Sequence, residues 1–328
     1  MLPNYPTISS ILAFLTLFSV SSLSFAIGFG EPDGNRHPSI GSLRYIFNNL
    51  DARISCTGEL IYKDADKYVI LTAAHCSQPE LDGWNSIAPG LGSVGVSFNE
   101  FNLPDDTDPT DGGADGVEYV SGGVSIEHPL YRFPGNSGFN DTYDIDLVII
   151  PTNAKNSYGQ TIAQLWGNLP VMPVAGLNYN DALIAKKFAN QTLVAVGYGT
   201  SPTKSPIGSG SGNKVKGDSD ASFPNRNLAY ILYKNANGAM INVATQMNAQ
   251  GVTGTLCAGD SGGPLLLKMP DGKELILGVL TAGSLGNCAN STGGYSRIDL
   301  PAVVKFLSCA SVPGNAAAVK ACVDNQFK

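Results

Sequence analysis

The order of the histidines and of one glycine-flanked serine limits the folds open to this chain. Ser261 lies in the stretch Gly259–Gly263, which reads Gly-Asp-Ser-Gly-Gly. Glycine permits a tight turn there, because it adopts backbone dihedrals that residues with a Cβ resist. Such a turn presents a hydroxyl beside the N–H groups of Gly259 and Ser261, which would stabilise an oxyanion. All three histidines of the chain precede this serine: His37, His75 and His128.

A serine hydroxyl needs a base to become a nucleophile, and a histidine usually supplies it. The α/β-hydrolases carry the same Gly-x-Ser-x-Gly letters, but their histidine follows the serine, so the order of residues here excludes them. His75 follows the apolar run 68–71, which predicts a buried strand that delivers it to an interior site. His37 and His128 each stand before a proline in turn-rich sequence, and we interpret both as surface or structural residues.

Two motifs in order, Thr-Ala-Ala-His-Cys at 72–76 and Gly-Asp-Ser-Gly-Gly-Pro at 259–264, resemble those of the chymotrypsin/trypsin-like serine peptidase family. The resemblance runs from about 30 to 308 and implies two six-stranded antiparallel β-barrels with the active site between them. Composition also favours an all-β fold, because 38 glycines and short strand-like runs occur without alternating helices. We expect a signal peptide over 1–26, barrels over 27–165 and 166–299, and a C-terminal helix with a disulfide-closed tail over 300–328.

The resemblance assigns His75 as general base and Ser261 as nucleophile, with the N–H groups of Gly259 and Ser261 as oxyanion hole. A carboxylate must also orient the histidine, and Asp144 and Asp146 compete for that role. The family pattern places Asp144 at the catalytic position. Choosing Asp146 would shift Pro151 into the following strand, where proline breaks the hydrogen-bond ladder. We therefore predict the triad His75, Asp144 and Ser261.

Substrate preference follows from the family's pocket positions. Thr255 stands at the pocket floor, where trypsin-like members carry aspartate, and a buried basic side chain there would lack a counter-charge. Gly283 would leave the pocket wall open to a large uncharged side chain. We expect a secreted serine endopeptidase that does not prefer cleavage after Lys or Arg. The alternatives are a catalytically silent homologue acting as a binding or adhesion module, and an exported esterase on the same site.

The first 26 residues contain no charged side chain, hold an apolar core at 11–18 and end in Ser-Phe-Ala. This pattern is typical of a secretory signal peptide, and the apolar run is shorter than the roughly 20 residues of a spanning helix. We expect an extracellular or periplasmic protein with no membrane contact after signal removal. Cleavage after Ala26 would expose Ile27, which the resemblance would pair with Asp260. A net charge of −7 argues against nucleic acid as a partner; peptide or protein substrates, and a protein inhibitor, are the expected partners.

Six cysteines after an export signal indicate three disulfides. Spacing alone does not choose among the connectivities. The resemblance implies the pairs Cys56–Cys76 and Cys257–Cys288, and Cys309 with Cys322 would then close a loop in the tail. The sequence has no Cys-x-x-Cys motif or Cys/His cluster of zinc-binding type. Its acidic stretch at 100–118 matches no EF-hand loop, which favours a solvated insertion over the alternative, a calcium site. We expect neither a metal nor a cofactor.

Overall fold

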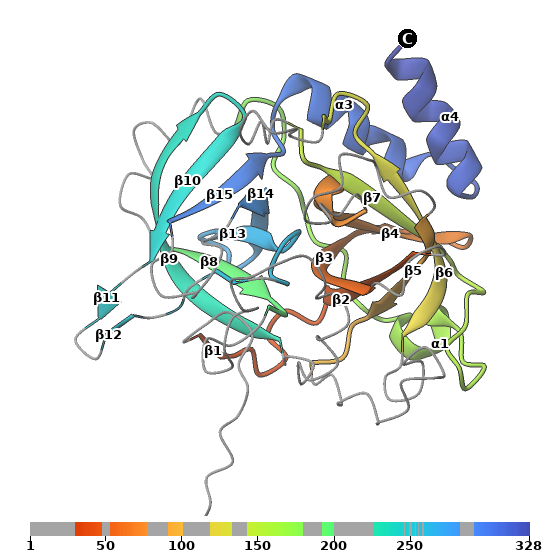
Figure 1. The fold of residues 1–328 in the computed structure, drawn as a ribbon, viewed down its shortest axis with the longest axis horizontal. Helices are drawn as coiled ribbons and strands as arrows, with labels where there is room; N and C mark the ends of the chain where they lie inside the picture. Colours follow the sequence, from red (N-terminus) through yellow and green to blue (C-terminus); the bar gives the residue numbers. More distant parts are fainter. Residues whose placement is uncertain are drawn as a thin grey trace, which may run out of the picture.

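The chain forms two β-barrels that lie side by side, with helices at the C-terminal end (Figure 1). The structure is a computed structural model. It describes residues 30–47, 53–77, 91–100, 119–132, 143–179, 192–199, 226–245, 247–248, 251–252, 254, 256–257, 259–282 and 292–328. The expected all-β class with two six-stranded antiparallel barrels is confirmed.

The first barrel closes in the strand order β2-β3-β4-β7-β6-β5. Its strands are β2 (Ile40–Phe47), β3 (Arg53–Lys63), β4 (Lys67–Thr72), β5 (Leu91–Ser97), β6 (Val120–Glu127) and β7 (Asp146–Pro151). The apolar run before His75 forms most of β4, and all six residues of that strand are buried. Because β4 pairs with both β3 and β7, its end brings the histidine segment beside the start of β7.

The second barrel closes through pairing of β9 with β8, in the order β9-β10-β15-β14-β13-β8. Its strands are β8 (Thr192–Gly197), β9 (Asn227–Asn237), β10 (Met240–Thr245), β13 (Pro264–Lys268), β14 (Glu274–Ala282) and β15 (Thr292–Arg297). A short hairpin of β11 (Met247–Asn248) and β12 (Gly251–Val252) lies outside it. Strand β1 (Glu31–Pro32) pairs with β9. The chain therefore contacts the second barrel before it builds the first.

The helices are short, and in Figure 1 α1 lies below the first barrel whereas α3 and α4 lie at the top of the molecule. They are η1 (Ala74–Cys76), α1 (Ile162–Trp166), α3 (Pro301–Ser308), η3 (Cys309–Ser311) and α4 (Ala316–Gln326). Pro301 begins α3, in the C-terminal region where a helix was expected. The tail beyond it adds a helix that the sequence analysis did not predict, capped by the side chain of Asn315. Among the described helices, none has both the length and the apolar content needed to span a bilayer.

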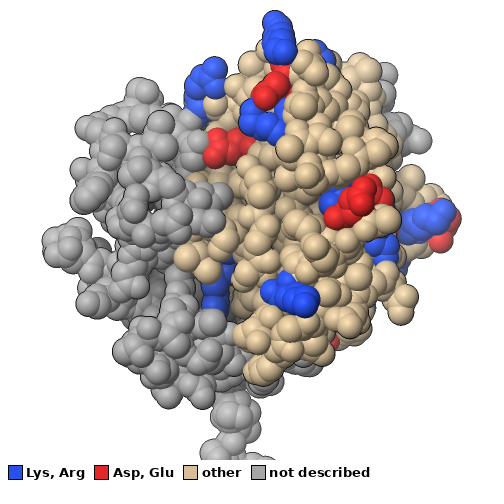
Figure 2. Space-filling model, turned by 90° about the vertical axis from the view of Figure 1, so that its right-hand side faces the viewer, with Lys and Arg blue, Asp and Glu red and all other residues tan. Residues whose placement is uncertain are grey.

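Charged side chains are sparse on the outer face of the first barrel. Figure 2 shows a few Lys, Arg, Asp and Glu side chains, some of opposite charge next to one another, on a mostly uncharged described surface. This distribution agrees with a chain in which only 14% of residues are charged. The described part of this face thus carries charges of both signs.

Candidate active site

His75 and Asp144 are joined by two hydrogen bonds. The His75 backbone N–H donates to Asp144 Oδ1 (2.8 Å), and its ring Nδ1 donates to Asp144 Oδ2 (2.6 Å). The Asp144 side chain is 2% exposed, whereas that of His75 is 29% exposed. A carboxylate can only accept, so the proton of the neutral ring lies on Nδ1. This tautomer leaves Nε2 as the ring nitrogen that can take a proton from a nucleophile.

Asp144 is presented by a tight turn before β7. Ile145 N donates to Tyr143 O (2.7 Å), which closes a three-residue turn with Asp144 at its centre. Tyr143 has a φ of 65°, in the left-handed region that non-glycine residues seldom adopt. The carboxylate therefore emerges from the end of the first barrel next to the segment that follows β4.

Asp146, the competing carboxyl group, does not make this contact. It is fully buried, its Oδ2 accepts from Ser125 Oγ, and no described group donates to its Oδ1. Burial raises the pKa of Asp146 to about 7, and the Ser125 hydrogen bond offsets this only in part. Of the two aspartates, Asp144 is the one in hydrogen-bond contact with His75.

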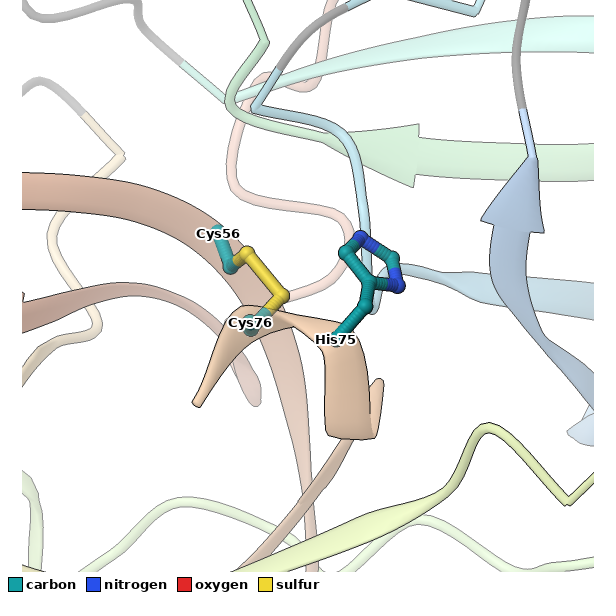
Figure 3. Close-up of side chains that lie close together, drawn as sticks. All are labelled: Cys56, His75 and Cys76. Carbon is teal, nitrogen blue, oxygen red and sulfur yellow. A yellow bond between two sulfur atoms is a disulfide. The ribbon is translucent and has the colours of Figure 1, made fainter. Parts of the chain in front are cut away.

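A disulfide fixes the histidine segment to the barrel wall. Cys56 in β3 is bonded to Cys76 in η1, and Figure 3 shows this bridge beside the His75 ring. One potential ligand atom from each of these three residues lies within 4.8 Å of the others. Zinc binds cysteine as the thiolate, and both sulfur atoms are already joined in the disulfide. The group therefore offers a metal only one donor, His75.

The turn that carries Ser261, residues 259–263 and called here the serine turn, contacts the first barrel through Thr57. Thr57 N donates to Ser261 O (2.8 Å), and Thr57 Oγ1 donates to Gly259 O (3.0 Å). Cys76 Sγ lies 3.9 Å from the same Ser261 oxygen. The backbone of Ser261 is thus in contact with the residue that follows His75. Thr57 was missed in the sequence analysis, although it directly follows a cysteine expected to bridge to Cys76.

The buried carboxylate of Asp260 fixes the serine turn by accepting two backbone hydrogen bonds. Its Oδ1 accepts from Gly199 N (2.6 Å) and its Oδ2 from Cys257 N (2.8 Å), and the residue is 1% exposed. A Cβ on Gly199 would collide with this carboxylate, so the close approach requires glycine there. Ile27, the expected partner of Asp260, lies outside the described residues.

Backbone N–H groups of the serine turn divide into two sets. Asp260 N donates to Cys257 O, Gly262 N to Leu280 O and Gly263 N to Asp260 O. In the described part of the chain, neither Gly259 N nor Ser261 N donates a hydrogen bond. These two are the groups that the sequence analysis expected to form the oxyanion hole.

Other expected site residues are only partly described. Thr255 and Gly283, expected in the substrate pocket, lie outside the described residues, as does Cys288. Cys257 is disulfide-bonded, and a second described bridge joins Cys309 to Cys322. His37 and His128 are 5% and 1% exposed, so both are structural residues of the interior, and the surface interpretation is wrong.

Comparison with known proteins finds two proteases that are similar to this chain. No family model matches the chain. It is 30% identical over 231 residues to CLIP domain-containing serine protease B4 of Anopheles gambiae, a match that covers 70% of this chain and 54% of that protein. It is 31% identical over 247 residues to Melanization protease 1 of Drosophila melanogaster, covering 74% and 54%. The chain thus spans about half the length of the curated relatives it matches.

Proposed function

The chain belongs to the chymotrypsin/trypsin-like serine peptidase family, and from that premise we propose that it hydrolyses peptide bonds through His75, Asp144 and Ser261. One observation carries the proposal: both oxygens of the Asp144 carboxylate accept from His75, one from its backbone and one from its ring. This arrangement fixes the ring plane and the tautomer together. A histidine held in this way acts as a general base at Nε2.

Each step of the reaction has a residue to perform it. Ser261 Oγ attacks the substrate carbonyl while His75 Nε2 takes its proton, and the Asp144 carboxylate stabilises the imidazolium that forms. The N–H groups of Gly259 and Ser261 hold the oxyanion. His75 then protonates the leaving amine, and water, activated in turn by His75, hydrolyses the acyl-enzyme. Docking of the serine turn onto Thr57 supports this alignment.

Labelling with a fluorophosphonate probe tests the nucleophile. The unmodified chain should form one covalent adduct at Ser261, and Ser261→Ala and His75→Ala should abolish it. Labelling that persists in Ser261→Ala would refute the assignment. An unmodified chain that neither reacts with the probe nor hydrolyses casein would favour the alternative, a silent homologue that acts as a binding module. Ester turnover without casein hydrolysis would favour an esterase.

The two aspartates provide a matched pair of variants. In the general template of this reaction, replacing the orienting aspartate by asparagine lowers kcat about 10⁴-fold through the wrong histidine tautomer. Asp144→Asn should show a loss of that order, because Asp144 accepts from His75 Nδ1. Asp146→Asn should retain activity, because its carboxyl contacts Ser125. The reverse result would transfer the role to Asp146.

Substrates, partners and location are part of the proposal. We expect an exported enzyme that acts on peptides or proteins, with no preference for Lys or Arg before the cleaved bond because Thr255 supplies no counter-charge. A proteome-derived peptide digest gives the preference directly. Clear enrichment of Lys or Arg before the cleaved bond would overturn this part and leave the triad unaffected.

A further inference from the structure

We propose that His128 is a positioning residue for Asp144, and that the C-terminal tail completes the enclosure that holds it. His128, Tyr143, Phe306 and Phe327 form an aromatic cluster, called here the His128 cluster. The inference deepens the proposed function and rests on it for its catalytic consequence. Its structural part, the immobilisation of the turn around Asp144, is testable without activity.

His128 contacts the chain on both sides of Asp144. Its backbone N–H donates to Ile145 O (2.9 Å), on the C-terminal side. Its ring stacks on the Tyr143 ring, on the N-terminal side, with centroids 4.8 Å apart and planes 6° from parallel. Tyr143 has the unfavourable positive φ of this turn. One residue thus fixes the backbone after Asp144 and stacks against the side chain of the strained residue before it.

The His128 ring is itself held in one orientation. Its Nδ1 accepts from Leu130 N (3.1 Å), and its Nε2 donates to Ala302 O (3.3 Å) in α3. These two bonds define a neutral tautomer. Burial lowers the pKa of His128 to about 4, which the Ala302 carbonyl offsets only in part. The ring therefore stays uncharged in neutral solution and can stack on Tyr143 without a desolvated charge.

Two phenylalanines from the C-terminal region close the cluster. Phe306 of α3 meets the His128 ring edge-on at 5.0 Å between centroids, and Phe327, directly after α4, does so at 5.2 Å. Lys305 Nζ lies 5.0 Å above the Phe327 ring centroid. The tail that carries Phe327 is tied down by the Cys309–Cys322 disulfide. Figure 1 shows α3 and α4 lying along the β7 side of the first barrel.

The hydrogen bonds between Asp144 and His75 depend on the position of the turn that carries Asp144. Both of its oxygens are committed to His75, so a small rotation of the turn weakens two hydrogen bonds at once. Strand β7 begins only at Asp146, which means that the barrel ladder does not itself hold Asp144. The His128 cluster supplies contacts to the two residues that flank it. Removing a tail residue should therefore loosen the turn and leave the barrel folded.

Phe327→Ala is the test, with Phe327→Tyr as the conservative rescue and Val319→Ala as the matched control. Val319 is a buried residue of helix α4, which Phe327 directly follows, and it lies outside the cluster. Peptide hydrolysis should show kcat lowered about tenfold in Phe327→Ala with KM within about twofold, since misplacement of a catalytic group by a fraction of an ångström costs that much. Phe327→Tyr should restore kcat. Val319→Ala should lower Tm but keep kcat within about twofold.

Amide hydrogen exchange gives the second readout. The His75 N–H donates to Asp144 Oδ1, so it should exchange faster in Phe327→Ala and at the unmodified rate in Phe327→Tyr and Val319→Ala. Unchanged kcat and exchange in Phe327→Ala would overturn the inference, as would an equal loss of kcat in Val319→Ala. If the unmodified chain has no peptidase activity, the proposed function fails, and exchange at His75 alone decides whether the cluster immobilises Asp144.

Discussion

His37 Nε2 lies 2.9 Å from a carboxylate oxygen of Glu274, at the start of β14. The other ring nitrogen, Nδ1, bonds to Asp33, so one buried imidazole links the N-terminal segment to the second barrel between two carboxylates. Burial alone would lower the pKa of His37, but the hydrogen bonds that its ring donates to Asp33 and Glu274 outweigh burial, and the pKa is raised. The charged form of His37 therefore stabilises the fold.

The stability of the chain should depend on pH through this residue. A raised folded-state pKa means that the contribution of His37 is fully present below its ordinary value of 6.5 and is lost as pH rises through the raised value. Glu274→Gln removes one of the two carboxylates, so it should lower Tm at pH 6 and flatten the decline of Tm above pH 6.5. Thermal unfolding followed across this range measures both effects.

Glu31→Gln is the control for that experiment. Glu31 pairs with Arg36, and both side chains are about half exposed (50% and 46%), so the pair should contribute about 1 kcal/mol or less. Its Tm profile should parallel that of the unmodified chain. Identical profiles for Glu274→Gln and Glu31→Gln would show that His37 does not link stability to pH.

Arg226 anchors the same N-terminal segment. It is fully buried and donates to Asp33 Oδ2 (2.9 Å). Arg226→Met keeps much of the volume but leaves the Asp33 charge without this partner, which should lower the free energy of unfolding by about 3–5 kcal/mol. Urea unfolding gives the value. The double variant with Asp33→Asn should cost less than the sum of the two single changes, because it no longer buries an uncompensated charge. Strict additivity would contradict this.

The barrels were predictable because their strands are apolar runs bounded by turn residues. The run at 68–71 in β4 was expected to be a strand without knowledge of its partners, and a helix was expected in the C-terminal region that holds α3. Helix α4 was missed because a short alanine-rich run is only marginally helical by itself. The signal was present all the same, since Asn315 stands at its N-cap position after a glycine.

The buried polar groups were not predictable from local sequence. His37 precedes a proline in a turn-rich stretch, and its burial depends on Glu274, which is far away in the chain. His128 also precedes a proline in a turn-rich stretch, yet α3 and the tail cover it. Local patterns describe loops as polar and exposed; only the docking of distant elements turns such residues into interior ones. Thr57 belongs to this class, because its contact with Ser261 joins the two barrels.

Asp146 should give a pH effect through a different mechanism. The folded chain holds a proton on this buried carboxyl up to about pH 7, whereas the unfolded chain loses it near 3.8. The unfolded state thus binds fewer protons between these values, and stability falls as pH rises across that window. Asparagine mimics the protonated acid, so Asp146→Asn should raise stability at pH 8 by on the order of 4 kcal/mol, about 1.4 kcal/mol for each pKa unit, and change little at pH 4.

The control for Asp146 is an exposed acid on α4. Asp324 pairs with Lys320 at the surface, and Asp324→Asn should change stability by less than about 1 kcal/mol at either pH. Urea unfolding at pH 4 and pH 8 compares the two variants. A gain at pH 8 in Asp324→Asn as large as that in Asp146→Asn would trace the effect to net charge and not to the buried carboxyl.

Two glycines with similar positive φ angles allow backbone strain at the serine turn to be distinguished from steric overlap. Gly262 and Gly272 have φ values of 82° and 84°. A Cβ on Gly262 would overlap Thr72 Oγ1 and Thr57 O, whereas one on Gly272 meets no described atom within 4 Å. Gly272→Ala should cost about 1–2 kcal/mol of stability, the price of the left-handed conformation, and leave fluorophosphonate labelling unchanged. Gly262→Ala carries the same strain and must also push the turn off Thr57, so its labelling rate should fall about 100-fold or more. Equal labelling of the two variants would mean that contact of the serine turn with the first barrel does not align Ser261.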